Sequence, residues 1–172
     1  LAQNSFISGW KADKSNALAL NLKTTKHRYT MDNPSAEALK PLSTITVTTL
    51  TDLVSNNGQC SLREAIANAN NDNAAQSDCA AGSGADVIVL NVSGTYTLGG
   101  TELSVTSNIT IQEGSGVTAV ISGNNSSRIF NVSTTDGNLT LNGLTVQDGS
   151  SAASGGCIQV GALSGGTLNF KN

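Results

Sequence analysis

Ile129-Phe130-Asn131-Val132 and Cys157-Ile158-Gln159-Val160 are two short apolar stretches that align at a shift of 28 residues. Leu139-Thr140-Leu141 aligns in the same way with Leu168-Asn169-Phe170, at a shift of 29. Ile109 in turn aligns with Leu139, at a shift of 30. A repeat of this length, built from short strands, is typical of a β-solenoid in which each turn of the chain lies on the previous one. An antiparallel sandwich of the same strands is the alternative.

Short apolar segments of this kind extend over most of the chain, with Gly, Asn or Ser in nearly every gap. They predict strands at residues 44–49, 86–91, 95–98, 108–112, 118–121, 129–132, 138–146, 157–160 and 167–170. We expect their alternating apolar side chains to point into one continuous core, formed by Ile88, Leu90, Ile109, Ile111, Val120, Ile129, Val132, Leu139, Leu141, Ile158, Val160, Leu168 and Phe170.

The composition agrees with a chain of strands and tight turns. Of 172 residues, 59 are Ser, Thr or Asn and 18 are Gly, while charged residues make up only 12%. A strongly charged disordered chain is therefore excluded. The sequence has no run of 18 apolar residues and only six aromatic residues, so that we expect neither a membrane span nor a base-stacking nucleic-acid interface.

Residues 1–43 differ from the rest and form an N-terminal arm. The arm carries six Lys or Arg against three acidic residues, whereas residues 44–172 carry three against nine, so that the net charges are +3 and −6. Asn33 to Pro41 predicts a short helix at the boundary, because Pro34 follows a capping Asn and Pro41 ends the segment. Within the arm, Leu18, Leu20 and Leu22 share one face of a predicted strand that has no local partner.

A second helix is predicted at residues 61–70. Ser61 and Glu64 have the spacing of a capping box, in which each side chain accepts a hydrogen bond from the other residue's backbone N–H. Leu62, Ala65, Ile66 and Ala69 fall on one narrow stripe of the helix, so that we expect this face to cover apolar surface.

Cys60-Ser61-Leu62-Arg63-Glu64-Ala65-Ile66 is the most specific motif, and residues 79–88 and 94–98 extend the match. With these segments, residues 44–172 resemble the CSLREA-domain proteins. The resemblance implies a right-handed parallel β-helix on a bacterial surface, similar in architecture to polymorphic outer-membrane proteins, adhesins and pectin-lyase-like chains. In that architecture the helix would cap the first coil and hide its open edge.

Three cysteines are present. Cys60 and Cys79 flank the predicted helix without a nearby His, and we expect them to form a disulfide in an oxidising compartment. Two reduced thiols, or less readily a metal site, are the alternatives, although the spacing lacks the paired ligands of a zinc site. We expect Cys157 to be a buried, inert thiol.

The residues do not predict catalysis or a cofactor. Asp86, Glu102, Glu113, Asp136 and Asp148 are scattered, and His27 lies in the arm. We therefore expect a non-enzymatic, secreted protein of the bacterial surface, with a structural or adhesive role.

We expect its partners to be further copies of the chain, joined head to tail into an extracellular filament. In this hypothesis the arm docks on a neighbouring copy, because the segment that ends at residue 172 shows no cap of its own. One alternative is that a continuation of the native chain covers this edge. The other is that the arm folds back and adds a strand to its own body. A glycan- or ice-binding solenoid is the alternative function, followed by a polysaccharide-lyase-like enzyme.

Overall fold

The structure, a computed structural model, describes residues 42–132, 137–161 and 167–171. The strand and the short helix that the sequence predicts within residues 1–41 lie outside these ranges, as do Leu18, Leu20 and Leu22. In the part of the chain that is described, no helix is long and apolar enough to cross a membrane.

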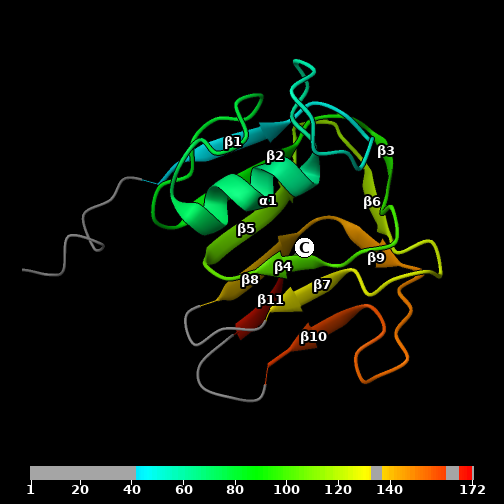
Figure 1. Ribbon diagram of the computed structural model, residues 1–172. Helices are drawn as coiled ribbons and strands as arrows, with labels where there is room; N and C mark the ends of the chain where they lie inside the picture. The colour runs from blue at the N-terminus through cyan, green and yellow to red at the C-terminus, as the bar shows by residue number, and fades with distance from the viewer. Residues whose placement is uncertain (1–41, 133–136, 162–166, 172) are drawn as a thin grey trace, which may run out of the picture. The chain divides into compact units, whose positions relative to one another are not determined.

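The described residues form mostly β-strands, with one helix (Figure 1). The elements in chain order are β1 (Thr44–Val47), α1 (Leu62–Asn71), β2 (Asp86–Leu90), β3 (Gly94–Thr97), β4 (Leu103–Val105), β5 (Asn108–Glu113), β6 (Ala119–Ser122), β7 (Phe130–Val132), β8 (Asn138–Asn142), β9 (Thr145–Gln147), β10 (Ile158–Val160) and β11 (Thr167–Lys171).

The strands form three sheets in which every pairing is parallel. Sheet A has the order β1-β2-β5-β8-β11, sheet B the order β3-β6-β9 and sheet C the order β4-β7-β10. From β2 onward the chain visits sheets A, B and C in the same order, three times, before it returns to sheet A with β11. From β2 onward, neighbours within a sheet are therefore separated in the sequence by two strands of the other sheets, whereas helix α1 separates β1 from β2.

The register within the sheets confirms the alignments that the sequence predicts. Ile158 lies beside Phe130, and Leu168 lies beside Leu139. Leu139 also lies beside Ile109 on its other side. These are the predicted shifts of 28, 29 and 30 residues, and their parallel sense excludes the antiparallel sandwich for the described strands.

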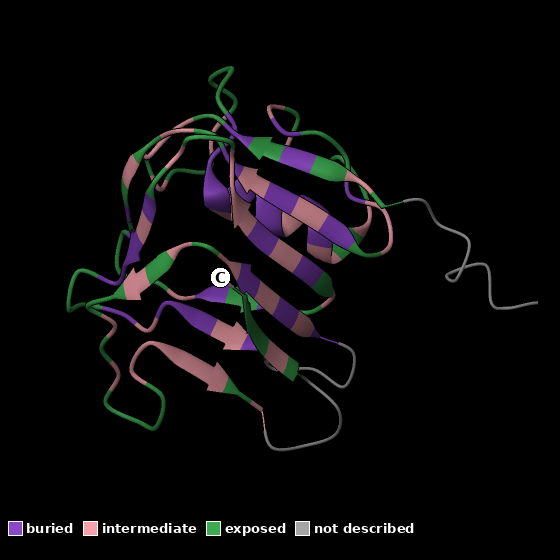
Figure 2. Cartoon of the chain, turned by 180° about the vertical axis from the view of Figure 1, so that it is seen from behind, coloured by how far each residue is buried: buried purple, intermediate pink, exposed green. Residues whose placement is uncertain are grey.

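Burial alternates along the strands of sheet A, as Figure 2 shows. In β2, β5 and β8 every second residue is buried, including Ile88, Ile111 and Leu141. Their neighbours face outward and are polar or β-branched, as expected for strands with only one face in a core.

Several strand predictions were wrong in detail. The predicted strand at 138–146 is two strands, because Gly143 between them adopts a φ of +80° and turns the chain from sheet A to sheet B. Strand β4 was missed, since three residues are too few for a periodic pattern to be recognised. In β6 the side chain of Val120 is half-buried and Ile121 is the core residue. The set of inward-facing side chains predicted for this strand was therefore shifted by one residue.

The predicted core is also incomplete at its C-terminal side. Ile158 and Leu168 are only half-buried, Val160 is 37% exposed and Phe170 is 68% exposed. Cys157, which we expected to be buried, is half-buried and carries a free thiol. The remaining predicted core residues are fully buried: Ile88, Leu90, Ile109, Ile111, Ile129, Val132, Leu139 and Leu141.

Candidate functional site: the two ends of the sheets

The two ends of the three sheets differ in what lies over them, and they are the main candidate functional surfaces. At the end of β1, β3 and β4, helix α1 lies over the core and contacts β1, β2, β4 and β5 (Figure 1). At the opposite end, β9, β10 and β11 are the last strands of their sheets in the described part of the chain.

Helix α1 begins with the predicted capping box. The Ser61 hydroxyl accepts a hydrogen bond from the Glu64 N–H at 3.2 Å, and the Glu64 carboxylate accepts one from the Ser61 N–H at 2.9 Å. The second oxygen of Glu64 accepts the Ser55 N–H at 2.8 Å. Ser61 also donates to the Leu53 carbonyl at 2.7 Å. The capping box therefore holds the preceding loop as well as the helix, and this explains why a carboxylate that is only 1% exposed is tolerated there.

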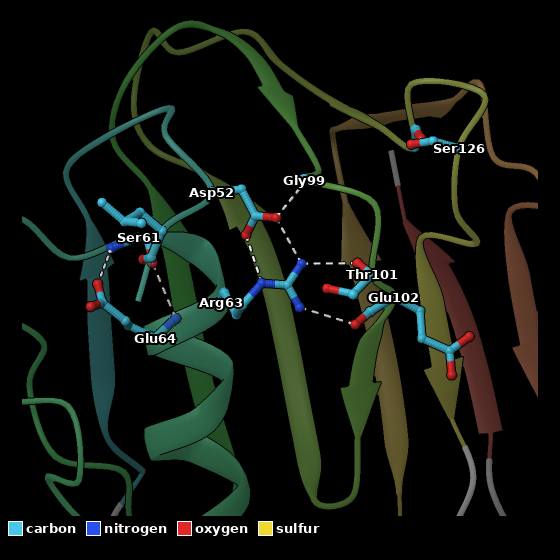
Figure 3. Close-up of polar contacts among 10 residues, drawn as sticks. Asp52, Ser61, Arg63, Glu64, Gly99, Thr101, Glu102 and Ser126 are labelled. Atoms are coloured by element: carbon cyan, nitrogen blue, oxygen red, sulfur yellow. Dashed lines mark hydrogen bonds and ion pairs between the residues drawn. The ribbon is translucent and has the colours of Figure 1, made fainter. Parts of the chain in front are cut away.

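Arg63 ties the helix to the loop before β4 (Figure 3). Its guanidinium makes a bidentate ion pair with Asp52, with N–O distances of 2.8 and 2.7 Å. It also donates to the carbonyls of Thr101 and Glu102, at 2.9 and 3.1 Å. Asp52 in addition accepts the Gly99 N–H at 2.7 Å. A planar fork of donors suits this arrangement, and an ammonium group cannot reproduce it.

Asn70 satisfies the backbone of edge strand β4 in the way a neighbouring strand would. Its amide donates to the Ser104 carbonyl at 2.8 Å and accepts the Thr106 N–H at 2.8 Å. At the preceding residue of the helix, the backbone carbonyl of Ala69 accepts a hydrogen bond from the Ser107 hydroxyl at 3.1 Å. Helix α1 therefore covers this edge with specific hydrogen bonds as well as with its apolar stripe.

The loop after α1 returns tightly to the helix. A disulfide joins Cys60 to Cys79, the pairing that we expect from the sequence. The buried amide of Asn68 donates to the carbonyls of Gln76 and Ala80, at 2.9 and 3.0 Å. Gly82 lies against the helix backbone so closely that a Cβ atom would come within 2.3 Å of the Asn68 carbonyl oxygen. The sequence analysis missed Asp52, Asn68 and Asn70, whose partners are distant in the chain.

At the opposite end of the sheets, two of the described residues expose large apolar side chains. Phe170 continues the inward row of Leu141 and Ile111, but its outer side has no neighbour in the described residues. Val160 occupies the corresponding place in β10, next to Val132. An edge strand with exposed backbone and apolar side chains is a template for further strand pairing.

Outward-facing amides and hydroxyls form rows on sheet A. Asn138 lies between Asn108 and Thr167, and its side-chain amide Nδ2 donates to the side-chain Oδ1 of Asn108 at 2.5 Å. The side-chain Oδ1 of Asn138 accepts the Thr167 N–H at 3.0 Å and the Thr167 hydroxyl. These rows line a groove of about 350 Å³ across four strands, formed by Leu42, Ala85, Asp86, Asn108, Ile109, Thr110, Asn138, Thr140, Thr167 and Asn169.

Asp86 lies at one end of this groove and is only 1% exposed. Its Oδ1 accepts the Ser83 N–H at 2.9 Å, whereas its buried Oδ2 has no hydrogen-bond partner. Burial raises the pKa of this carboxyl above 3.8, and the nearby charge of Asp72 raises it further against the lowering effect of the Ser83 N–H.

The acidic residues do not converge in the described ranges. No group of three or more His, Cys, Asp or Glu residues there could hold a metal ion. Glu102 instead pairs with Arg128 at 2.6 Å, and Glu113 accepts the Ala119 N–H at 2.6 Å. Asp148 accepts the Ser122 hydroxyl at 3.1 Å. Asp136 and His27 lie outside the described residues.

The fold and the site define a mostly β protein of small parallel sheets, covered at one end by a disulfide-tied helix. Comparison with models of protein families finds no match, and comparisons with curated proteins and with solved structures find no significant similarity.

Proposed function

We propose that the three sheets are the faces of a right-handed parallel β-helix. Three features support this proposal: the fixed order of visits to sheets A, B and C, the parallel pairing throughout, and the short returns between paired strands. Asp86 returns beside Ile109 after 23 residues, and Asn108 returns beside Asn138 after 30. A right-handed sense follows from the strong preference of parallel crossover connections for that hand.

In this proposal the chain is a secreted, non-enzymatic module of the bacterial cell surface, with a structural or adhesive role. The CSLREA-like motif at residues 60–66 supports a surface location, and the Cys60–Cys79 disulfide agrees with an oxidising compartment. The observation that carries the proposal is the contrast between the ends: α1 covers one, while Phe170 is 68% exposed at the other.

The exposed end is the proposed acceptor for the arm of a second copy. A strand containing Leu18, Leu20 and Leu22 has the same alternation as β11, where Leu168 and Phe170 take the inward positions. Adding such a strand to the edge of β11 would supply backbone hydrogen bonds and cover both side chains. The net charge of +3 on residues 1–43 against −6 on the rest favours this contact. Because the donor and acceptor surfaces differ, the contact propagates head to tail.

Deletion of residues 1–30 tests this function. The full chain should form length-dispersed filaments in electron micrographs, whereas the shortened chain should stay monomeric with its circular dichroism unchanged. The triple variant Leu18→Ser, Leu20→Ser, Leu22→Ser should behave like the deletion. Its matched control, Ala17→Ser, Ala19→Ser, Asn21→Ser, changes the opposite strand face and should still assemble. A full chain that remains monomeric at high concentration, with its arm protected from protease, would contradict the proposal.

Glycan binding is a second candidate, favoured by the polar groove on sheet A. Its rows repeat at the strand spacing of about 4.8 Å, and they offer amide and hydroxyl groups to a polymer that lies across the strands. The rows do not repeat one residue type, because Val87 stands beside Thr110, and this argues against ice binding. Thr110→Leu with Thr140→Leu should abolish retention on insoluble polysaccharide, whereas Ser115→Leu, on a separate loop, should not. Release of reducing or unsaturated sugar ends would instead indicate a carbohydrate-active enzyme.

A further inference from the structure

The groove on sheet A changes in chemistry from one side to the other. Where it crosses β5, β8 and β11, amide and hydroxyl side chains such as Asn108 line it. Toward β1 and β2 it is lined by Leu42, which is 67% exposed, and by the exposed residue Ala85. The pairing of Asp86 with Ile109 places Ala85 beside Asn108. We call Leu42 and Ala85 the apolar subsite, and Asn108 stands at its border with the polar part of the groove.

The side chain of Asn108 is held in place by its neighbours on the polar side. Its Oδ1 accepts the Asn138 Nδ2 group at 2.5 Å, and the Oδ1 of Asn138 in turn accepts the N–H and the hydroxyl of Thr167. Hydrogen bonds in such a chain orient and polarise one another. None of the described residues accepts a hydrogen bond from the Nδ2 group of Asn108. Asn108 therefore offers a fixed amide donor at the border of the apolar subsite.

The groove presents no exposed charge among the described residues that line it. Asp86 is the one ionisable residue in this set, and it is only 1% exposed. Residues 44–172, which include the whole groove, carry a net charge of −6. A polymer of acidic sugars would be repelled by this charge, whereas a neutral polymer would not. The groove therefore suits a neutral ligand that has both polar and apolar groups.

We propose that the groove binds a neutral polysaccharide of N-acetylated sugars, with an acetamido group at the border between its two parts. The acetamido carbonyl oxygen accepts a hydrogen bond from the Asn108 Nδ2 group, and the methyl group contacts Ala85 and Leu42. A sugar that carries only hydroxyl groups has no methyl group to cover the apolar subsite. This inference rests on the glycan-binding candidate described above and names the class of sugar that it takes.

Two soluble hexamers with the same β-1,4 linkage provide the first test. One consists of N-acetylglucosamine and the other of glucose, so that they differ only in the acetamido group that replaces a hydroxyl. Isothermal titration calorimetry of the full chain should show that the acetylated hexamer binds at least about tenfold more tightly, as expected when one hydrogen bond and one methyl contact are added.

Two matched variants test the role of Asn108. Asn108→Asp keeps an oxygen that accepts the Asn138 amide but replaces the Nδ2 donor by a second acceptor. Its affinity for the acetylated hexamer should fall about tenfold, with its circular dichroism unchanged. Gln112→Glu makes the same chemical change on the same strand, outside the groove, and should bind like the unmodified chain.

A third variant tests the apolar subsite. Leu42→Ser with Ala85→Ser should reduce the preference for the acetylated hexamer over the glucose hexamer, because the methyl group then lies against hydroxyl groups. Both side chains are exposed, so that the fold should tolerate these changes. An unchanged preference in this folded variant would show that the subsite does not contact the methyl group.

The outcomes separate this inference from the candidate on which it rests. If the two hexamers bind with equal affinity, glycan binding stands and the preference for acetamido sugars is wrong. If Gln112→Glu weakens binding as much as Asn108→Asp does, the added charge causes the loss and Asn108 is not the contact. If neither hexamer binds, this inference and the glycan-binding candidate both fall, while the proposal of filament assembly is unaffected.

Discussion

Phe170 lies directly beside Leu141 in the parallel register of sheet A, yet Leu141 is 2% exposed and Phe170 is 68% exposed. The two side chains occupy equivalent positions on successive strands. They differ because Leu141 has a neighbouring strand on both sides, whereas Phe170 has one only on the side of β8 in the described residues. This single difference accounts for the exposure of Phe170 among the described residues.

Truncation of these two residues should therefore have very different effects. Leu141→Ala should lower the free energy of unfolding by about 2 to 5 kcal/mol, since it removes buried contacts and leaves a cavity. Phe170→Ala should change it by no more than about 0.5 kcal/mol in the monomer, as is usual for exposed positions. Urea unfolding at concentrations below assembly measures both values, and equal losses would show that Phe170 is buried in the monomer.

The disulfide should anchor the loop after α1. Replacing Cys60 and Cys79 by Ser should lower the free energy of unfolding by about 3 kcal/mol, because a closed loop of this size restricts the unfolded chain. Cys157→Ser, at the free thiol, is the control and should have little effect. Thiol labelling of the denatured, unreduced protein should find one reactive cysteine; three would show that the bond is absent.

Arg63→Lys should weaken the cap although it preserves the charge. An ammonium group cannot serve both oxygens of Asp52 and the carbonyls of Thr101 and Glu102, so that partly buried acceptors lose their partners. We expect a loss of about 1 to 3 kcal/mol. A double-mutant cycle with Asp52→Asn should give a coupling well above that of an exposed ion pair, and additive effects would indicate that the contact contributes little.

Asp86 should make stability depend on pH. Because its pKa is raised in the folded state, the folded chain retains a proton that the unfolded chain loses just above pH 3.8. The stability contributed by this carboxyl therefore falls as the pH rises from 3.8 through the folded pKa, and it stays low above that value.

Asp86→Asn removes this ionisation and keeps the acceptor for the Ser83 N–H. The variant should gain stability relative to the unmodified protein between pH 3 and pH 7, as measured by unfolding at both values. A difference that is the same at both pH values would show that Asp86 ionises with its ordinary pKa.

The sequence predicts those parts of the fold that depend on local patterns and on the repeat. The capping residues Ser61 and Glu64 mark the start of α1, and the aligned apolar residues Ile109, Leu139 and Leu168 identify the register of β5, β8 and β11. The capping box and the repeat are both fixed spacings along the sequence, so that they can be recognised without a structure.

Features that depend on distant partners could not be predicted in this way. Asn70 and Asp52 are ordinary polar residues in the sequence, and their roles arise only when the fold brings β4 and its preceding loop to the helix. The exposure of Phe170 has the same origin, because its residue type and spacing are those of a core position. Phe170 differs from such a core position because the described residues place a strand on only one side of it, and no local pattern specifies this.

Diffraction from oriented filaments of the full chain tests the central claim most directly. If copies of a parallel β-helix join end to end, the strands lie across the filament axis and stack along it. We therefore expect a meridional reflection near 4.8 Å, the distance between paired strands. The chain that lacks residues 1–30 should form no filaments and should give no such reflection. Filaments whose 4.8 Å reflection lies on the equator, or filaments that form equally well without the arm, would contradict the account.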